Sequence, residues 1–131
     1  MSIEFNYDSH TRIVFTRAEG LVTFEDVQKH LDEEAAAEGA TGYGEIFDAS
    51  GASTNLTAAE VRLLVERVLS MTKAGPFGPT AIITTNDTAF GMARMLEILS
   101  ELQGGPQMAV FKTFNEGLEW LRAQTTGSLP L

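Results

Sequence analysis

One local pattern, a threonine followed three residues later by an acidic side chain, occurs at three places in the chain. The pairs are Thr23 with Asp26, Thr57 with Glu60, and Thr113 with Glu116. In a capping box the threonine hydroxyl accepts from the backbone N–H three residues on, and the side chain at that position accepts from the threonine N–H. Each pair therefore predicts the first turn of a helix, and apolar residues recur at helical spacing after it.

Strand-like segments lie between these predicted helices. Ile3, Phe5 and Tyr7 alternate with polar residues, and residues 13–16 resume strand character after a turn, which predicts an antiparallel hairpin. Three later apolar segments are centred on residues 46–47, 82–83 and 110–111. Helices separate them, which favours parallel pairing through right-handed crossovers. We predict an α/β fold, an N-terminal β-hairpin followed by alternating helices and strands, with a mixed, mostly parallel sheet of about five strands and about four helices.

The chain is 131 residues long, which suits a single domain. No linker or long repeat interrupts it, so we expect one domain over residues 1–124 and a frayed tail over 125–131. Glycines are expected to end the first helix at Gly39 and Gly42 and the second at Gly75-Pro76. Residues 49–55 are predicted to form a polar loop, and a third long helix is expected from about Asp87 to Leu102.

Composition excludes several classes of function. The chain has no cysteine, which removes disulfides, thiol nucleophiles and thiolate metal sites. The net charge of −9 disfavours nucleic acid and anionic membrane surfaces. The N-terminus has no basic and apolar signal segment, and no apolar stretch approaches the ~20 residues that span a bilayer. We expect a soluble cytoplasmic protein that neither binds nucleic acid nor inserts stably into membranes.

Residues that could support catalysis are few. Only two histidines occur, His10 in the hairpin turn and His30 on the first helix, and no second base or ligand is spaced to join them. We expect both to be solvated. Residues 32–34 are consecutive acids that point in different directions on a helix, so they are expected to form a solvated face. We therefore predict no enzyme activity, no metal and no cofactor.

The segment that follows the strand predicted around residues 46–47 is the best candidate for a binding or modification site. It is small and polar, and it lies between the carboxyl end of a strand and a helix start, where ligands of α/β sheets tend to bind. The candidate residues are Asp48, Ser50, Gly51, Ser53, Thr54 and Thr57. The alternative is that they only end a strand and form turns.

The third long helix has two apolar faces, whereas a helix on a sheet needs only one. One face carries Ala89, Met92, Ala93, Leu96 and Leu99. The second face carries Phe90, Met95, Ile98 and Leu102. This second face is compatible with burial between layers, with a homodimer interface, or with a groove for an apolar ligand.

The chain resembles the SpoIIAA-like superfamily, which has the fold of STAS-type anti-sigma-factor antagonists. The resemblance rests on the order of elements, on Gly20-Leu21-Val22-Thr23 with Asp26, and on the ending from Val110 to Leu121. In the antagonists, the serine after the central-strand aspartate is phosphorylated by a partner kinase. Here Asp48-Ala49-Ser50-Gly51 places alanine at that position. The superfamily also resembles CRAL-TRIO lipid carriers, which implies that an apolar ligand is an alternative.

Two functions follow as expectations. The first is a bacterial, non-enzymatic regulatory or protein-interaction domain, a homodimer that docks a signalling partner through residues 48–54 and is controlled by phosphorylation of Ser50 or Ser53. The second is a carrier or sensor of a small, lipid-like apolar ligand in a groove beside the helix at 87–102.

Overall fold

The computed structural model describes residues 2–36, 42–72 and 78–127. The helix ends predicted at Gly39 and at Gly75-Pro76 lie outside these residues. The strands are β1 (Ser2–Asp8), β2 (Ile13–Val22), β3 (Gly44–Thr54), β4 (Thr80–Ile83) and β5 (Met108–Phe111). The helices are α1 (Phe24–Ala36), α2 (Ala58–Thr72), α3 (Asp87–Leu102) and α4 (Phe114–Gly127).

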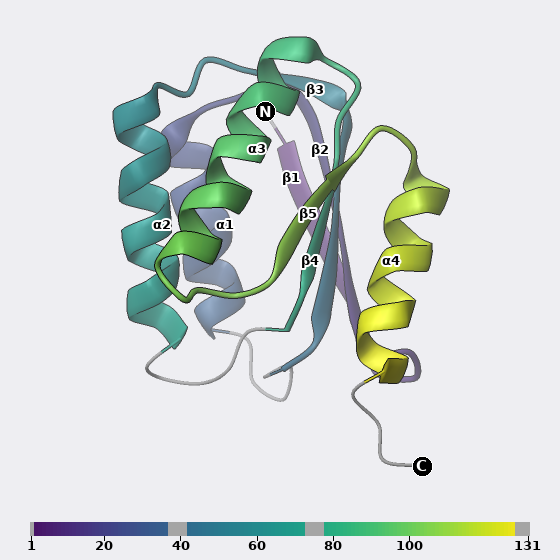
Figure 1. Ribbon diagram of the computed structural model, residues 1–131. Helices are drawn as coiled ribbons and strands as arrows, with labels where there is room; N and C mark the ends of the chain where they lie inside the picture. Colours follow the sequence, from purple (N-terminus) through teal and green to yellow (C-terminus); the bar gives the residue numbers. More distant parts are fainter. Residues whose placement is uncertain (1, 37–41, 73–77, 128–131) are drawn as a thin grey trace.

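The five strands form one sheet in the order β1-β2-β3-β4-β5. β1 pairs antiparallel with β2, and the other neighbouring strands pair parallel. Helices α1, α2 and α3 lie on one face of the sheet and α4 lies on the other (Figure 1). The predicted fold class, a hairpin followed by alternating helices and strands in a mostly parallel sheet, is confirmed.

The threonine–acid pairs form the predicted helix starts. The N–H of Thr23 donates to Asp26 over 2.9 Å, and the N–H of Asp26 donates to the Thr23 hydroxyl over 3.2 Å. The pair at the start of α2 repeats both bonds at 2.9 and 3.1 Å. At α4 the Thr113 hydroxyl donates to the Glu116 carboxylate and accepts from its N–H. Because these bonds satisfy otherwise free N–H groups, they fix where each helix begins.

The prediction of a loop at residues 49–55 is wrong, because β3 continues to Thr54. β2 is ten residues long and runs to Val22, so it offers hydrogen-bonding partners beyond the point where the apolar signal ends. The register shifts between Arg17 and Glu19, and pairing then resumes until Val22 lies opposite Thr54. Tertiary pairing thus overrides the small, polar composition of this segment.

The face of the sheet under α4 is packed closely. Its buried cluster consists of Ile13, Ile46, Ala81, Ile83 and Leu121. A Cβ added at Gly117 of α4 would overlap Cδ1 of Ile83, so the glycine allows the helix to lie close to the sheet without displacing this side chain. α4 continues to Gly127, so the first three residues of the predicted tail, 125–127, are helical, and residues 128–131 lie outside the described part. Among the described helices, none has the length and apolar character needed to cross a membrane.

Candidate functional site

On the opposite face of the sheet, a partly open cavity of about 160 Å³ lies under α1, α2 and α3. Successive side chains of a strand point to opposite faces of the sheet, and this decides which of them line the cavity. Phe47, Ile82 and Met108 face the three helices, while Ile46 and Ile83 face α4. α3 contributes Ala89, Met92, Ala93 and Leu96, which are four of the five residues of its first apolar face. The walls are therefore almost wholly apolar, and the small alanine side chains of α3 leave space that larger residues would fill.

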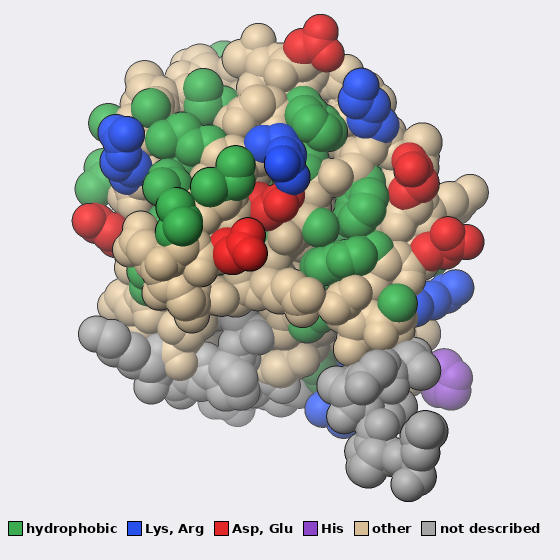
Figure 2. Space-filling view, in the orientation of Figure 1, with side chains coloured by type: hydrophobic (Ala, Val, Ile, Leu, Met, Phe, Trp, Pro, Cys, Tyr) green, Lys and Arg blue, Asp and Glu red, His purple; other side chains and the backbone are tan. Residues whose placement is uncertain are grey.

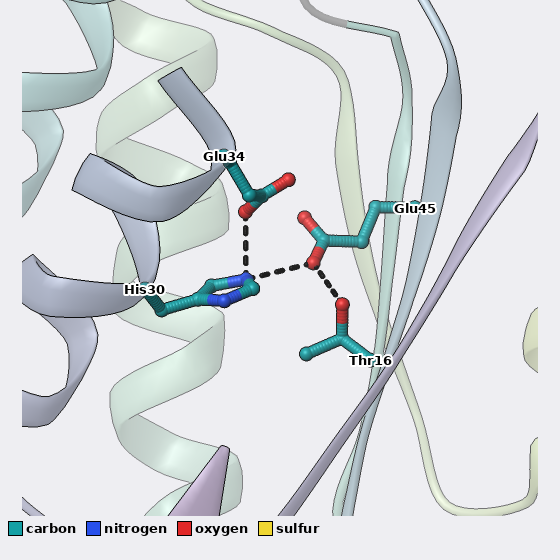
Figure 3. Close-up of polar contacts among 4 residues, drawn as sticks. All are labelled: Thr16, His30, Glu34 and Glu45. Atoms are coloured by element: carbon teal, nitrogen blue, oxygen red, sulfur yellow. Dashed lines mark hydrogen bonds and ion pairs between the residues drawn. The ribbon is translucent and has the colours of Figure 1, made fainter. Parts of the chain in front are cut away.

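The cavity has one strongly polar region, formed by His30, Glu34 and Glu45 (Figure 3). His30 and Glu34 are one turn apart on α1, so they extend from the same side of the helix, and Glu45 extends from β3 toward them. Nε2 of His30 lies 2.6 Å from Glu34 Oε1 and 3.0 Å from Glu45 Oε2. The hydroxyl of Thr16 donates to the same Glu45 oxygen over 2.5 Å. One imidazole nitrogen is thus shared by two carboxylates.

Burial and charge shift the pKa values of this cluster in definite directions. Burial alone would lower the pKa of His30, but hydrogen bonds and charge from Glu34 and Glu45 outweigh it and raise the pKa to about 10. Burial and the neighbouring Glu45 raise the pKa of Glu34 to about 7, although His30 acts in the opposite direction. Burial, with the charges of the same two acids, raises the pKa of Tyr7 to about 12. The region therefore carries more negative charge than the imidazole can balance.

Whether the cluster could hold a metal depends in part on the contacts of Nδ1, the second ring nitrogen of His30. One ligand atom from each of His30, Glu34 and Glu45 lies within 4.8 Å of the others, and this donor set suits zinc. A metal-binding histidine almost always donates its second N–H to a carboxylate, a carbonyl or water. Nδ1 of His30 is buried and has no hydrogen-bond partner among the described residues. The ligand geometry is present, but the supporting contact that a metal site needs is missing.

The prediction that both histidines are solvated is wrong for His30, which is 3% exposed, while His10 is exposed. Phe5 and Phe47 pack on the His30 ring with centroids at 5.2 and 5.6 Å. The prediction that the acids at 32–34 form a solvated face is wrong for Glu34, whose side chain is 10% exposed. The missed signal is the spacing of residues 27, 30, 31 and 34, which places His30 and Glu34 on the buried stripe of α1.

The residues of the predicted binding loop lie in different surroundings in the structure. Ser50 is exposed, and its N–H and hydroxyl donate to Asp48 Oδ1 over 3.1 and 2.7 Å. Thr54 donates to the carbonyl of Val22, and Thr57 caps α2. Ser53 and Thr54 also line the cavity, which Asp48, Ser50, Gly51 and Thr57 do not. Only part of the predicted segment therefore meets the cavity.

The second apolar face of α3 lies away from the cavity. None of its four predicted residues, Phe90, Met95, Ile98 and Leu102, lines it. Ile98 and Leu102 are 44% and 76% exposed, and Figure 2 shows hydrophobic side chains at the surface over α2 and α3. The apolar space associated with residues 87–102 thus lies beneath the helix, against its first face. The role of the second face stays a prediction.

Comparison with models of known protein families gives no match, and comparison with curated protein sequences gives none. Solved structures do match. An uncharacterized protein of the DUF3478 family with a SpoIIAA-like fold, from Shewanella loihica PV-4, superposes with a TM-score of 0.55 at 16% identity, over 92% of each chain. The anti-sigma factor antagonist SpoIIAA in its unphosphorylated form gives 0.53 at 18% identity, over 92% of this chain and 98% of that one. The chain therefore has the SpoIIAA-like fold.

Proposed function

We propose that this chain is a non-enzymatic regulatory domain that binds a small apolar ligand in the cavity beneath α3. The observation that carries the proposal is the cavity itself, about 160 Å³ of space with apolar walls and a single polar cluster. An engineered apolar protein cavity of about 150 Å³ stays dry and binds benzene. Concave, mostly apolar sites with a few convergent polar groups are the usual form of small-molecule pockets.

Several features favour binding over catalysis. His30 is held between two carboxylates, and its pKa of about 10 makes it a poor general base near neutral pH. No cysteine exists to act as a nucleophile. The hydroxyl of Thr16 donates to the Glu45 carboxylate, which also contacts the imidazole of His30 and is therefore a weak base for activating it. These groups can orient a ligand, and none of them is a nucleophile paired with a strong base.

Carbon-13 labelling of the methionine methyl groups tests the cavity directly. Met92 and Met108 line it, while Met95 lies on the other face of the same helix and serves as an internal control. Titration with benzene or benzyl alcohol is expected to shift the Met92 and Met108 methyl signals and to leave Met95 unchanged. Equal shifts at all three methyl groups, or no shift at any, would contradict the proposal.

A second candidate function, protein docking at the carboxyl end of β3, is favoured by the exposure of Ser50, which donates to Asp48, and by the exposure of Ser53. A structural neighbour is an anti-sigma factor antagonist solved in its unphosphorylated form. In this proposal a cytoplasmic signalling protein in a bacterium binds residues 48–54, and phosphorylation of Ser50 or Ser53 adds about two negative charges that change the binding. Incubation with host lysate and ATP, followed by mass spectrometry, tests it: phosphate at neither serine removes the switch.

Homodimer formation belongs to the same proposal. The exposed apolar side chains Ile98 and Leu102 on α3 offer a surface that a second copy would cover. Light scattering on wild type and on Ile98→Asp is the test. We expect a dimeric mass for wild type and a monomeric mass for the variant, and a monomeric wild type at high concentration would refute the interface.

A further inference from the structure

We propose that the ligand of this cavity carries a cationic head, a protonated amine, which binds between the carboxylates of Glu34 and Glu45 while its apolar part fills the space beneath α3. This inference rests on the proposed function, because it names the chemical class of the ligand that the same cavity would take.

The first step is a count of donors and acceptors. Both carboxylates contact the same nitrogen of His30, at 2.6 and 3.0 Å, and a single ring N–H cannot satisfy two carboxylates fully. Figure 3 shows that the second oxygens of Glu34 and Glu45 point toward one another. Thr16 adds one donor, which goes to the Glu45 oxygen that already contacts His30. Acceptor capacity is therefore in excess at the end of the cavity, and an ammonium group brings three N–H donors.

The second step is charge. The side chains that line the cavity include two acids and one histidine, and no lysine or arginine is among the described lining residues. Two ionised carboxylates with one imidazolium leave a net negative charge next to apolar walls, which is unfavourable unless a cation or a proton balances it. Burial, together with the negative charge of Glu45, raises the pKa of Glu34 to about 7, and a nearby cation would oppose this shift. A ligand cation would balance this charge, whereas an anionic ligand would be repelled.

The third step is the nature of the walls. Phe47 lines the cavity directly beside His30. The face of an aromatic ring attracts an ammonium group, and this attraction strengthens where water is excluded. An organic cation suits this setting better than a metal ion, because Nδ1 of His30 lacks the second partner that metal-binding histidines have. The volume of about 160 Å³ admits a group close to one aromatic ring.

Three probes of matched shape separate the head group from the apolar part: benzylamine, benzyl alcohol and benzoate. Binding is measured near pH 7.5 by calorimetry, and the Met92 and Met108 methyl signals report that each probe occupies the cavity. We expect benzylamine to bind at least about tenfold more tightly than benzyl alcohol, since charge-assisted hydrogen bonds are roughly twice as strong as neutral ones. We expect benzoate to bind most weakly.

Two variants and one control assign the effect to the cluster. Glu34→Gln and Glu45→Gln should each reduce benzylamine affinity at least about tenfold, toward that of benzyl alcohol, and should change benzyl alcohol affinity much less. Retained benzyl alcohol binding also shows that each variant is folded. Glu33→Gln removes the same charge from an exposed position on the same helix, so it should preserve the preference for the amine.

The outcomes separate this inference from the proposed function. Cavity binding of benzyl alcohol as tight as that of benzylamine would overturn the cationic head and leave the apolar cavity intact. If Glu33→Gln weakens the preference for the amine as much as Glu34→Gln does, the preference comes from general attraction by the net charge of −9. The assignment of the amine to Glu34 and Glu45 would then be overturned. Tight zinc binding that Glu34→Gln and Glu45→Gln both abolish would replace the amine with a metal. Failure of all three probes to shift Met92 and Met108 would overturn the proposed function together with this inference.

Discussion

The two faces of the sheet differ in how closely their side chains pack and in whether ionisable groups are buried there. Under α4, one helix covers a buried apolar cluster, and Gly117 allows close contact with Ile83. Under α1, α2 and α3, three helices cover a cavity and a buried group of ionisable side chains. Close packing stabilises a fold most where no space remains, whereas space and unbalanced charge cost stability and permit binding. The α4 face is therefore packed more closely, whereas the opposite face, which also buries Leu31, Leu64 and Val68, is the one with space for a ligand.

The arrangement of the helices accounts for the difference. α4 contacts β3, β4 and β5, the central and later strands of the sheet. On the other face, α1 contacts β1, α3 contacts β3 and β5, and α2 packs on both of these helices (Figure 1). The side chains that meet above the middle strands on this face include Ala89 and Ala93, which are too small to close the gap. A cavity is the consequence.

The largest expected effect is on the α4 face. Leu121 is fully buried, so Leu121→Ala should lower the free energy of unfolding by about 3–4 kcal/mol, through lost burial and a new void. Leu96 of α3 already borders empty space and is half-buried, so Leu96→Ala should cost only about 1–2 kcal/mol. Urea denaturation of both variants provides the measurement. Equal losses would mean that the two faces are packed alike, and the comparison would fail.

The second effect is the pH dependence that the cluster on the other face produces. The folded pKa of His30, about 10, exceeds its usual value of 6.5, so the folded state holds a proton that the unfolded chain releases as pH rises through 6.5. Its contribution is full below that pH and disappears as pH approaches 10. Glu34, raised from 4.5 to about 7, acts in the same direction over its own range. At about 1.4 kcal/mol per pKa unit, we expect His30 alone to lose roughly 3 kcal/mol of its contribution between pH 6 and pH 9.

Two histidine variants isolate this contribution in denaturation measurements across pH. His30→Gln should flatten the decline of the unfolding free energy between pH 6 and pH 9. His10 is exposed, so His10→Gln should leave the slope of the wild type unchanged. A wild-type profile as flat as that of His30→Gln would show that the carboxylates do not hold the proton on His30.

Most of the fold could be predicted from the sequence because its signals are local. The Thr-x-x-acid pairs placed three helix starts, and the alternation at Ile3, Phe5 and Tyr7 placed the first strand. The end of β3 could not be predicted in this way. Its last residues are small and polar, and they pair only because β2 extends far enough to meet them. Pairing between distant segments is not encoded in the local pattern of either one.

The candidate site was missed for a related reason. His30 and Glu34 carry a helical spacing that sequence reasoning could have used, since they flank Leu31 on the buried stripe. The burial of Glu45 was harder to predict from the sequence, because a single acid beside Ile46 is also typical of a half-exposed strand. What brings the three together is the placement of α1 over β3, and this is a property of the assembled sheet. A charge that looks solvated in sequence is buried here because its partners lie on another element.

Filling the cavity should have a moderate effect in the opposite direction. Ala93→Leu would place three more carbon atoms in the space beneath α3, which should raise the unfolding free energy by about 1 kcal/mol and prevent benzyl alcohol binding. Ala123→Leu on α4 adds the same atoms at an exposed position and should change neither quantity. Thermal unfolding with and without the probe measures both. A loss of more than about 1 kcal/mol in Ala93→Leu would indicate overpacking, and hence no usable space in solution.

The smallest expected effect is at Ser50, near the carboxyl end of β3, because this residue lies outside both packed faces. Ser50 is exposed and does not line the cavity, so Ser50→Glu should change the unfolding free energy by less than about 0.5 kcal/mol, even though it brings a second carboxylate near Asp48. Ser53 lies on the cavity wall, and Ser53→Glu should weaken probe binding as well. Urea denaturation and probe titration of both variants separate the two positions. A surface meant for docking must tolerate added charge without unfolding, so a cost above about 1 kcal/mol at Ser50 would make this segment part of the scaffold and remove the structural basis for a phosphorylation switch there.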